Sequence, residues 1–179
     1  MSEETIRRSE LMWGAIAAFG VGIMAAVIVV SSFAMAIHPP SNVETIDPTT
    51  LNTNSEFAES NLGTRVNPDG SVTVRIVATQ FEFLPRCIPV PKDRQVTFRV
   101  TSPDVIHGFL IAGSNANTMV VPGYVAQLRT VFSSAGDHLM PCHEFCGLGH
   151  SEMWALVKVL DGAEWKPDAS GKASCELPR

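Results

Sequence analysis

The stretch "SVTVRIVATQFEF", residues 71–83, alternates apolar and other side chains and decides the class of fold. Val72, Val74 and Ile76 fall on one face of an extended chain, whereas Arg75 falls on the opposite face. A period of two residues is typical of a β-strand with one face in a protein core. The stretch therefore predicts a β-strand that begins soon after residue 71.

Further short apolar segments follow at regular intervals, with Gly and Pro residues between them. They are "CIPVP", "QVTFRVTS", "HGFLIAG", "NTMVV", "VAQLRTVF", "GDHLMPC" and "MWALVKVL". Short strands at this spacing predict a mainly β fold, a Greek-key sandwich or barrel over residues 71–160. Residues 38–70 are rich in Pro, Asn, Ser and Thr without an apolar period, which predicts a linker lying on a surface. Residues 161–179 lose the alternation and predict a tail that is bound to the surface or loose.

The segment of residues 11–37 contains no charged side chain. Because a helix needs about 20 apolar residues to cross a bilayer, this segment predicts a transmembrane helix. Arg7 and Arg8 precede it, and the next basic residue is Arg65. The positive-inside rule therefore places residues 1–10 in the cytoplasm and the rest of the chain outside.

A cleaved signal peptide is the alternative for the N-terminal segment, because Ala34, Met35 and Ala36 have the form of a cleavage site. The apolar region of a signal peptide is only about 7–15 residues long, however, so the longer segment favours a permanent anchor. The net charge of −5 is mild and the basic residues are scattered along the chain. A nucleic-acid partner is therefore not expected.

The stretch "PCHEFCGLGHSEM", residues 141–153, carries the chemistry of the chain. It contains Cys142, Cys146, His150 and Met153. On an exported face, two cysteines at this spacing could form a structural disulfide. The histidine and the methionine favour a metal site instead, because thiolate, thioether and imidazole together select copper, and zinc would not need the methionine.

His107, in "SPDVIHGFLI", begins a predicted strand and is the candidate ligand from outside this stretch. A mononuclear blue-copper site uses one cysteine, two histidines and a weak methionine. The second cysteine departs from that pattern, because two thiolates can bridge two copper ions. A dinuclear centre of this kind moves one electron with little change of geometry, so it suits electron transfer rather than bond making.

The pattern C-x-E-x-C-G-x-x-H-x-x-M, preceded by D-V-x-H, resembles the dinuclear copper (CuA) domain of cytochrome c oxidase subunit II. The stretches "TSPDVIHGF", "VVPGYVAQLRTVFSSAGDH" and "CHEFCGLGH" read in register with this family, over about residues 72–160. The single apolar span and "IDPTT" are most similar to its B-type (ba-type) branch. The resemblance implies a cupredoxin-like Greek-key β-barrel anchored by one N-terminal transmembrane helix.

The resemblance also implies the copper ligands, which are His107, Cys142, Glu144, Cys146, His150 and Met153. The two cysteines would bridge both ions, and each histidine would ligate one of them. The methionine and the backbone carbonyl of Glu144 would be weak axial ligands. In many relatives the carboxylate at this glutamate also reaches a magnesium ion at the boundary with subunit I, whereas some B-type members have Gln here, so the residue leaves a second metal open.

The function implied by the resemblance is electron input to a terminal haem–copper oxidase in a bacterial or archaeal plasma membrane. Electrons would come from cytochrome c or a small copper protein and pass to haem in subunit I, where oxygen is reduced to water with proton translocation. The copper domain would lie on the outer or periplasmic face. A nitric oxide reductase with the same copper module is the nearest alternative, and a copper delivery protein is a remote one.

Three further sets of residues are candidates for a role. Phe81 and Phe83 occupy the segment in which relatives carry the aromatic ring of electron input, although both could instead pack in the core, because at a period of two they share one face. Glu10 opens the membrane span, where B-type relatives carry a glutamate at the mouth of the proton-input path, although it could be a solvated acid. Cys87 and Cys175 remain after the copper ligands are assigned, and they either form a disulfide or stay free.

Two other histidines lie near the candidate ligands. His138 occupies a position at which relatives often have an aromatic residue, so we expect it to pack against neighbours or lie at the rim of the site. His143 lies between Cys142 and Glu144, and we expect it to face solvent or a partner rather than a metal.

Overall fold

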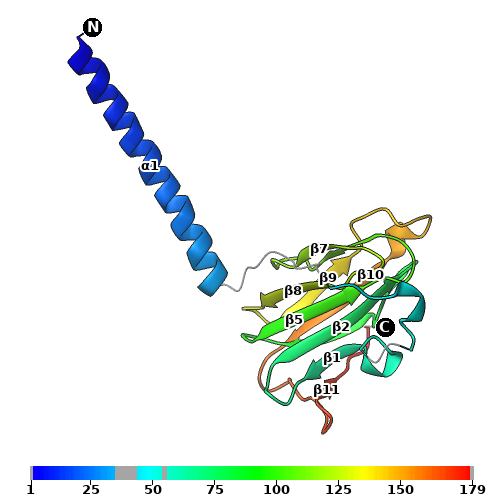
Figure 1. Ribbon diagram of the computed structural model, residues 1–179. Helices are drawn as coiled ribbons and strands as arrows, with labels where there is room; N and C mark the ends of the chain where they lie inside the picture. The colour runs from blue at the N-terminus through cyan, green and yellow to red at the C-terminus, as the bar shows by residue number, and fades with distance from the viewer. Residues whose placement is uncertain (1, 35–43, 54–55, 178–179) are drawn as a thin grey trace. The chain divides into compact units, whose positions relative to one another are not determined.

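The computed structural model describes residues 2–34, 44–53 and 56–177, which belong to two compact units, a helix and a β domain (Figure 1). The helix, α1, spans Glu3–Ala34 and is 32 residues long. At 1.5 Å per residue it measures about 48 Å, which exceeds the roughly 30 Å core of a bilayer. The predicted span at residues 11–37 is therefore helical as far as Ala34, and its last residues lie outside the described part.

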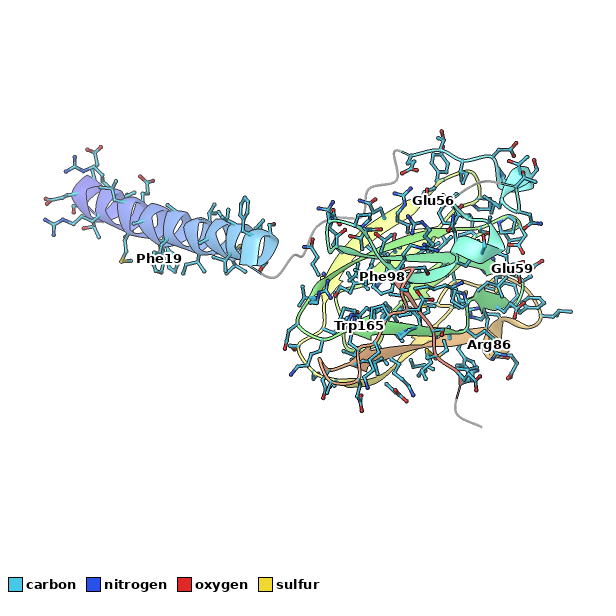
Figure 2. The ribbon with its side chains drawn as sticks, turned by 90° about the horizontal axis from the view of Figure 1, so that it is seen from below. Phe19, Glu56, Glu59, Arg86, Phe98 and Trp165 are labelled. Carbon is cyan, nitrogen blue, oxygen red and sulfur yellow. A yellow bond between two sulfur atoms is a disulfide. The ribbon has the colours of Figure 1, made fainter. Side chains whose placement is uncertain are left out.

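The apolar side chains of α1 are exposed all around the helix. Phe19, labelled in Figure 2, is one of the large apolar side chains that project outward, and so are Leu11, Trp13 and Met24. Water would make such exposure costly, whereas lipid matches it. Length, composition and exposure together make α1 a membrane span.

The strands of the β domain match the segments predicted from the sequence, except that the stretch of residues 71–83 forms two antiparallel strands and that additional strands lie outside the predicted segments. The strands are β1 (Gly63–Val66), β2 (Val72–Thr79), β3 (Glu82–Leu84), β4 (Cys87–Pro91), β5 (Gln95–Thr101), β6 (His107–Leu110), β7 (Asn117–Val120), β8 (Ala126–Val131), β9 (Gly136–Pro141), β10 (Trp154–Leu160) and β11 (Lys172–Ala173). Short 3₁₀ helices lie at Pro48–Thr50, Glu59–Asn61 and His150–Glu152.

The strands form two main layers. One sheet has the order β11-β1-β2-β5-β8, with β3 paired to β2, and a second has the order β4-β10-β9. Figure 1 shows the long strands of the first sheet in front of β9 and β10. β2 with β5 and β4 with β10 are parallel pairs, which require crossover connections between the layers. The predicted mainly β, cupredoxin-like architecture is therefore confirmed.

Aromatic rings fill the space between the layers. Phe98, labelled in Figure 2, is fully buried, and its ring centroid lies 5.8 Å from that of Phe109. Phe83 meets Phe109 edge to face, with centroids 6.4 Å apart. Each such ring stabilises the fold by roughly 1.5–3 kcal/mol through burial. Cys142 and Cys146 belong to the same buried cluster, so the candidate ligands are part of the core.

The segment predicted as a linker is docked on the first sheet from Glu44 onward. The Val125 backbone N–H donates to the Glu44 carbonyl at 2.9 Å. Leu51 and Phe57 are buried in a second apolar cluster with Val125. Strand β1 also lies within the predicted linker, so the β domain begins well before residue 71. The described residues of this segment therefore lie on the surface of the β domain and are part of its packing.

Charged contacts complete the docking of this segment. Arg99 on β5 donates to Glu44 at 2.6 Å and also to Glu56, and both acids come from the docked segment. Arg99 further donates to Gln127 on the neighbouring strand at 2.7 Å. Burial alone would raise the pKa of Glu56, but hydrogen bonding and charge from Arg99 and Arg75 outweigh it and lower the pKa. The arginines of the sheet therefore favour the ionised acid of the segment.

The C-terminal tail is held to the domain at two places. β11 pairs antiparallel with β1, so that Ala173 lies opposite Thr64. Cys87 and Cys175 form a disulfide across a sequence separation of 88 residues. In the chain-entropy description, a loop of this length corresponds to roughly 4 to 5 kcal/mol of stabilisation. The tail is therefore bound to the surface, which was one of its two predicted states.

Candidate metal centre

The loop between β9 and β10 carries most of the candidate ligands. β9 and β10 pair antiparallel as far as Pro141 opposite Trp154. The next pair closes the loop, because the Cys142 backbone N–H donates to the Met153 carbonyl at 3.0 Å. The residues that carry the first thiol and the thioether are therefore backbone neighbours at the base of the loop. The residues between them form a short excursion that returns Cys146 to the core.

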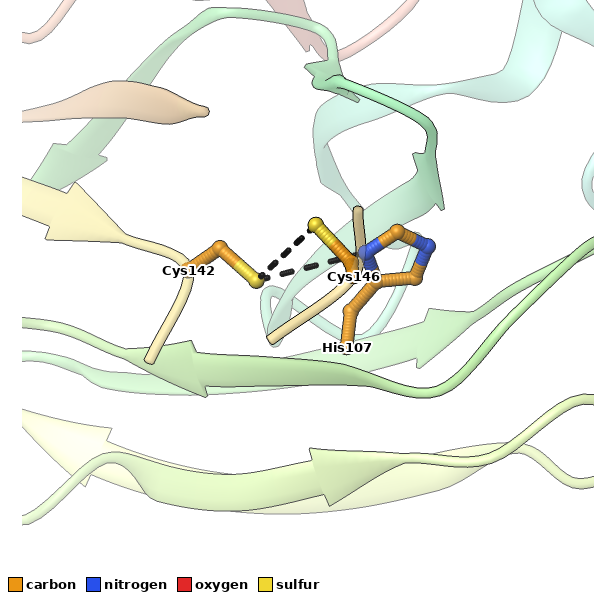
Figure 3. A group of neighbouring side chains, drawn as sticks. All are labelled: His107, Cys142 and Cys146. Carbon is orange, nitrogen blue, oxygen red and sulfur yellow. Dashed lines mark hydrogen bonds between the residues drawn. The ribbon is translucent and has the colours of Figure 1, made fainter. Parts of the chain in front are cut away.

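His107 comes to the same place from the start of β6. Its Nε2 lies 2.8 Å from the Asp104 carboxylate, so Nδ1 is the ring nitrogen left for a metal. Nδ1 lies 4.0 Å from the Cys142 sulfur, as the dashed line in Figure 3 marks. The ligand atoms of His107, Cys142 and Cys146 all lie within 4.8 Å of one another, and all three side chains are buried.

Short distances link the remaining candidates to the two thiols. The Cys142 and Cys146 sulfurs are 3.9 Å apart, well beyond a disulfide bond, and both thiols are free. The Cys146 sulfur lies 3.7 Å from His150 Nδ1 and 3.6 Å from the Met153 sulfur. The Cys142 sulfur lies 3.2 Å from the Glu144 carbonyl oxygen. The structure thus brings all six predicted ligands together.

The donor set fits a soft cation. Cys142 and Cys146 are only 6% and 5% exposed, and Met153 is fully buried. Burial, and then the neighbouring Cys142, raise the pKa of the Cys146 thiol to about 11. Two thiolates in this place are costly without positive charge, which a metal ion supplies. Two thiol donors, two imidazole donors and one thioether donor suit copper better than they suit a hard cation.

Asp104 organises the side of the site from which His107 comes. Besides the histidine, its carboxylate accepts hydrogen bonds from the Thr79 hydroxyl at 2.9 Å and the Ser102 hydroxyl at 2.9 Å. The Gln80 backbone N–H donates to it at 2.7 Å. Burial alone would raise the pKa of Asp104, but the His107 and backbone hydrogen bonds outweigh it and lower the pKa. The acid is therefore ionised and fixes the ring orientation of His107.

Gln80 and Phe81, which follow β2, pack directly against the loop of residues 142–153, which we call the cysteine loop. A Cβ atom on Gly147 would lie 2.9 Å from the Phe81 ring, and one on Gly149 would lie 2.6 Å from it. Gly147 also has a φ of +130°, which other residues rarely adopt. The Gln80 side-chain amide donates to the Cys146 carbonyl. Gln80 and Asp104 had no predicted role: the contact of Gln80 lies 66 residues away in the chain, whereas Asp104 stands in the D-V-x-H pattern, which was used only to identify His107.

The two candidate aromatic residues for electron input have different positions. Phe83 is on β3 and 0% exposed, so it does not reach the surface. Phe81 lies before β3, outside the strand register, and is 37% exposed beside the cysteine loop. The two rings therefore do not share a face as the alternation suggested. Phe83 is a core residue, and Phe81 alone remains a candidate.

The other predicted residues lie away from the donor set. His138 is half-buried, packs on Phe132 with centroids 5.4 Å apart, and contacts the Ala112 carbonyl through Nδ1. His143 is exposed, and its Nε2 lies 2.7 Å from the Asn117 side-chain oxygen. Glu10 lies exposed on α1, in the unit separate from the β domain.

Apolar side chains project from the loop above the buried donors. Leu148 is 100% exposed and Phe145 is 73% exposed. Ile106 and Met119 are also exposed, and with Phe145 they line a surface hollow that includes Cys146. We call Phe81, Ile106, Met119, Phe145 and Leu148 the apolar rim. Exposed apolar side chains gathered at one place are typical of a contact surface.

Comparison with known proteins places this chain among subunits of respiratory oxidases. The family model described as "Cytochrome C oxidase subunit II, periplasmic domain" matches residues 71–160. A Thermus thermophilus protein named cytochrome c oxidase subunit 2 is 33% identical over 149 residues, which cover 80% of this chain and 89% of the relative. Another from Thermus thermophilus is 35% identical over 123 residues, which cover 69% of this chain and 91% of the relative.

A solved structure extends the similarity beyond the β domain. One chain of a heme-copper terminal oxidase dimer, determined by cryo-EM, is similar with a TM-score of 0.63 and 26% sequence identity. The match covers 85% of this chain and 99% of that chain. Such coverage is larger than residues 71–160 alone account for, so the likeness includes part of the chain before β2.

Proposed function

The chain belongs to the cytochrome c oxidase subunit II family, and we propose that its β domain holds two copper ions that receive electrons for a haem–copper oxidase. The chain is then the non-catalytic, electron-transferring subunit of an oxidoreductase complex. The observation that carries the proposal is a pair of buried thiols, Cys142 and Cys146, 3.9 Å apart and flanked by imidazoles.

The arrangement of donors supports two ions rather than one. Cys142 has an imidazole nitrogen of His107 and the Glu144 carbonyl within 4.0 Å of its sulfur. Cys146 has an imidazole nitrogen of His150 and the Met153 sulfur within the same distance. Each thiol therefore has one imidazole and one weak donor of its own. A mononuclear copper site of the blue type would need only one of the thiols.

When bound, a copper pair of this kind takes up and releases one electron at a time. The residues of the chain keep the donors in place while that happens. The hydrogen bond between Cys142 and Met153 closes the loop at its base, and the Asp104 carboxylate holds the His107 ring. Buried, hydrogen-bonded donors move little when the charge changes, which favours rapid electron transfer over bond making.

Copper analysis of the purified full chain tests the proposal. We expect two copper ions per chain and, in the mixed-valence state, a seven-line electron paramagnetic resonance pattern. Cys142→Ser and Cys146→Ser should each lose that pattern, because each removes a shared thiolate. His143→Ala, which alters an exposed neighbour in the same loop, should keep it. One copper per chain with a four-line pattern would contradict a dinuclear centre.

The electron donor docks on the apolar rim in this proposal. The rim lies over the buried thiols, with Phe145 next to Cys146 in the chain and Phe81 against Gly147. A c-type cytochrome or a small copper protein with an apolar patch around its own cofactor would fit this surface. Contact between apolar surfaces depends little on salt, because salt screens charges and not dispersion or burial.

Kinetics with the donor protein test the docking surface. Leu148→Asn should raise the KM for the donor several-fold and leave the copper spectrum unchanged, because only exposed apolar area is lost. Val131→Asn is the matched control, since Val131 is also exposed but lies on β8. The KM of the unaltered complex should change by no more than about twofold between low and physiological salt. A large salt effect would indicate docking by charge.

The membrane helix joins this domain to the membrane-embedded partner. With Arg7 and Arg8 at its start, the N-terminus of α1 faces the cytoplasm and the β domain lies on the outer face. Subunit I of the oxidase is the partner in the membrane. There electrons pass from the copper pair to haem, and oxygen is reduced to water with proton translocation. Glu10, near the cytoplasmic end of α1, serves proton input to that subunit.

Substitution of Glu10 separates proton input from electron input. Glu10→Gln should slow steady-state oxygen consumption by the whole complex, because a protonatable group is lost from the path. Reduction of the copper centre by the donor in a single turnover should be unaffected. Glu3→Gln, in the first turn of the same helix, is the matched control. Equal turnover in both variants would remove Glu10 from the path.

The Glu144 side chain provides a second metal site in this proposal. Its backbone carbonyl faces the Cys142 sulfur, while the residue itself is exposed, so the carboxylate is free to face subunit I. A carboxylate oxygen suits Mg²⁺, which prefers hard ligands. Glu144→Gln should lower the magnesium content of the complex and retain two copper ions, because the carbonyl remains. Unchanged magnesium in that variant would place the ion elsewhere.

A further inference from the structure

We propose that Gln80 is a positioning residue of the metal centre, which fastens the cysteine loop to the carboxylate that orients His107. The proposal rests on the proposed function in so far as the loop holds copper. The contacts themselves belong to the chain alone, so their effect on the loop can be measured with and without a metal.

Gln80 makes two hydrogen bonds that point in different directions. Its backbone N–H donates to the Asp104 carboxylate at 2.7 Å, at the end of β2. Its side-chain amide donates to the carbonyl of Cys146, which is 66 residues away in the chain. One residue therefore spans the gap between the Asp104 side of the centre and the cysteine loop.

The Asp104 side is firmly held, so it can serve as the fixed point. Its carboxylate accepts from the Thr79 and Ser102 hydroxyls at 2.9 Å each and lies 2.8 Å from His107 Nε2. The backbone of Gln80 is tied to this same carboxylate. The hydrogen bond from the Gln80 side chain to the loop therefore holds the loop at a fixed position relative to His107.

The contact of the neighbouring Phe81 with the loop is less directional. Phe81 packs against Gly147 and Gly149, so its ring limits how closely the loop can approach. A ring against glycine backbone does not fix the orientation of a particular peptide group. The hydrogen bond to the Cys146 carbonyl does so, because donors prefer to align with the carbonyl plane. The peptide that follows a buried thiol is thereby held in one orientation.

Removal of the Gln80 amide should loosen the loop without unfolding the domain, because much of Gln80 is exposed. Gln80→Leu preserves the approximate size and removes the donor. Asn117→Leu is the matched control. The Asn117 side chain accepts a hydrogen bond from the exposed side chain of His143 in the cysteine loop, and His143 is not a candidate ligand. The net value of one hydrogen bond corresponds to a change of roughly two- to tenfold in an opening equilibrium.

Two measurements on the full chain test the proposal. In the metal-free protein, loop amides from Glu144 to His150 should exchange hydrogen roughly two- to tenfold faster in Gln80→Leu than in Asn117→Leu. In the copper-loaded protein, Gln80→Leu should lose copper to a chelator faster by a similar factor and show an altered copper hyperfine pattern. Gln80→Glu, which also cannot donate, should behave in the same way.

The outcomes separate the two proposals. If Gln80→Leu and Gln80→Glu match Asn117→Leu in amide exchange, Gln80 does not position the loop, whatever the metal content. If the unaltered chain binds no copper but the exchange difference is present, the proposed function fails and the positioning role stands. If Gln80→Leu does not fold, Gln80→Glu provides the same comparison with a polar side chain.

Discussion

The closure of the β9–β10 loop by the hydrogen bond between the Cys142 N–H and the Met153 carbonyl is the constraint on which the centre depends. It extends the ladder of an antiparallel pair by one step and sets the first and last loop ligands side by side. The chain between them must then return on itself, which brings Cys146 back to the core and places His150 on a short 3₁₀ turn. One hairpin thus supplies every donor except His107.

This locality explains which parts of the site were predictable from the sequence. The loop ligands lie close together in the chain, so their residue types and spacing are visible without a structure. His107 was identifiable through the D-V-x-H pattern of the family. Asp104 belongs to the same pattern and was passed over, whereas Gln80 had no such signal, because its contacts join segments that are distant in the chain. Phe81 and Phe83 were assigned to one face, but Phe81 precedes β3, so the period of two does not apply to it.

The same difference applies to the fold. Strands with an apolar pattern were predictable, and segments held by contacts with distant residues were not. The strands from β2 to β10 carry apolar periodicity or short apolar runs, and their positions agree with the prediction, except that the one strand predicted within residues 71–83 is divided into β2 and β3. β1, β11 and the docked segment from Glu44 have no such period, because specific partners hold them. The buried Thr64 hydroxyl donates to the Pro89 carbonyl at 2.6 Å, and Arg99 binds two acids of the docked segment. Side-chain pairs of this kind, formed between distant positions, do not produce a pattern along the chain.

The depth of the donors, together with the thin cover above them, favours electron transfer over copper delivery. Cys146 is 5% exposed, yet the neighbouring Phe145 is 73% exposed and Cys146 borders a surface hollow, so the buried thiol lies near the surface. Burial raises the pKa of that thiol to about 11, so the thiol of the empty site is costly to ionise and a metal ion has to displace its proton to bind. A delivery protein needs ligands that a receiving protein can reach and replace. An electron needs no such access, and an apolar cover only a side chain thick lets a donor come close while water and competing ligands stay outside.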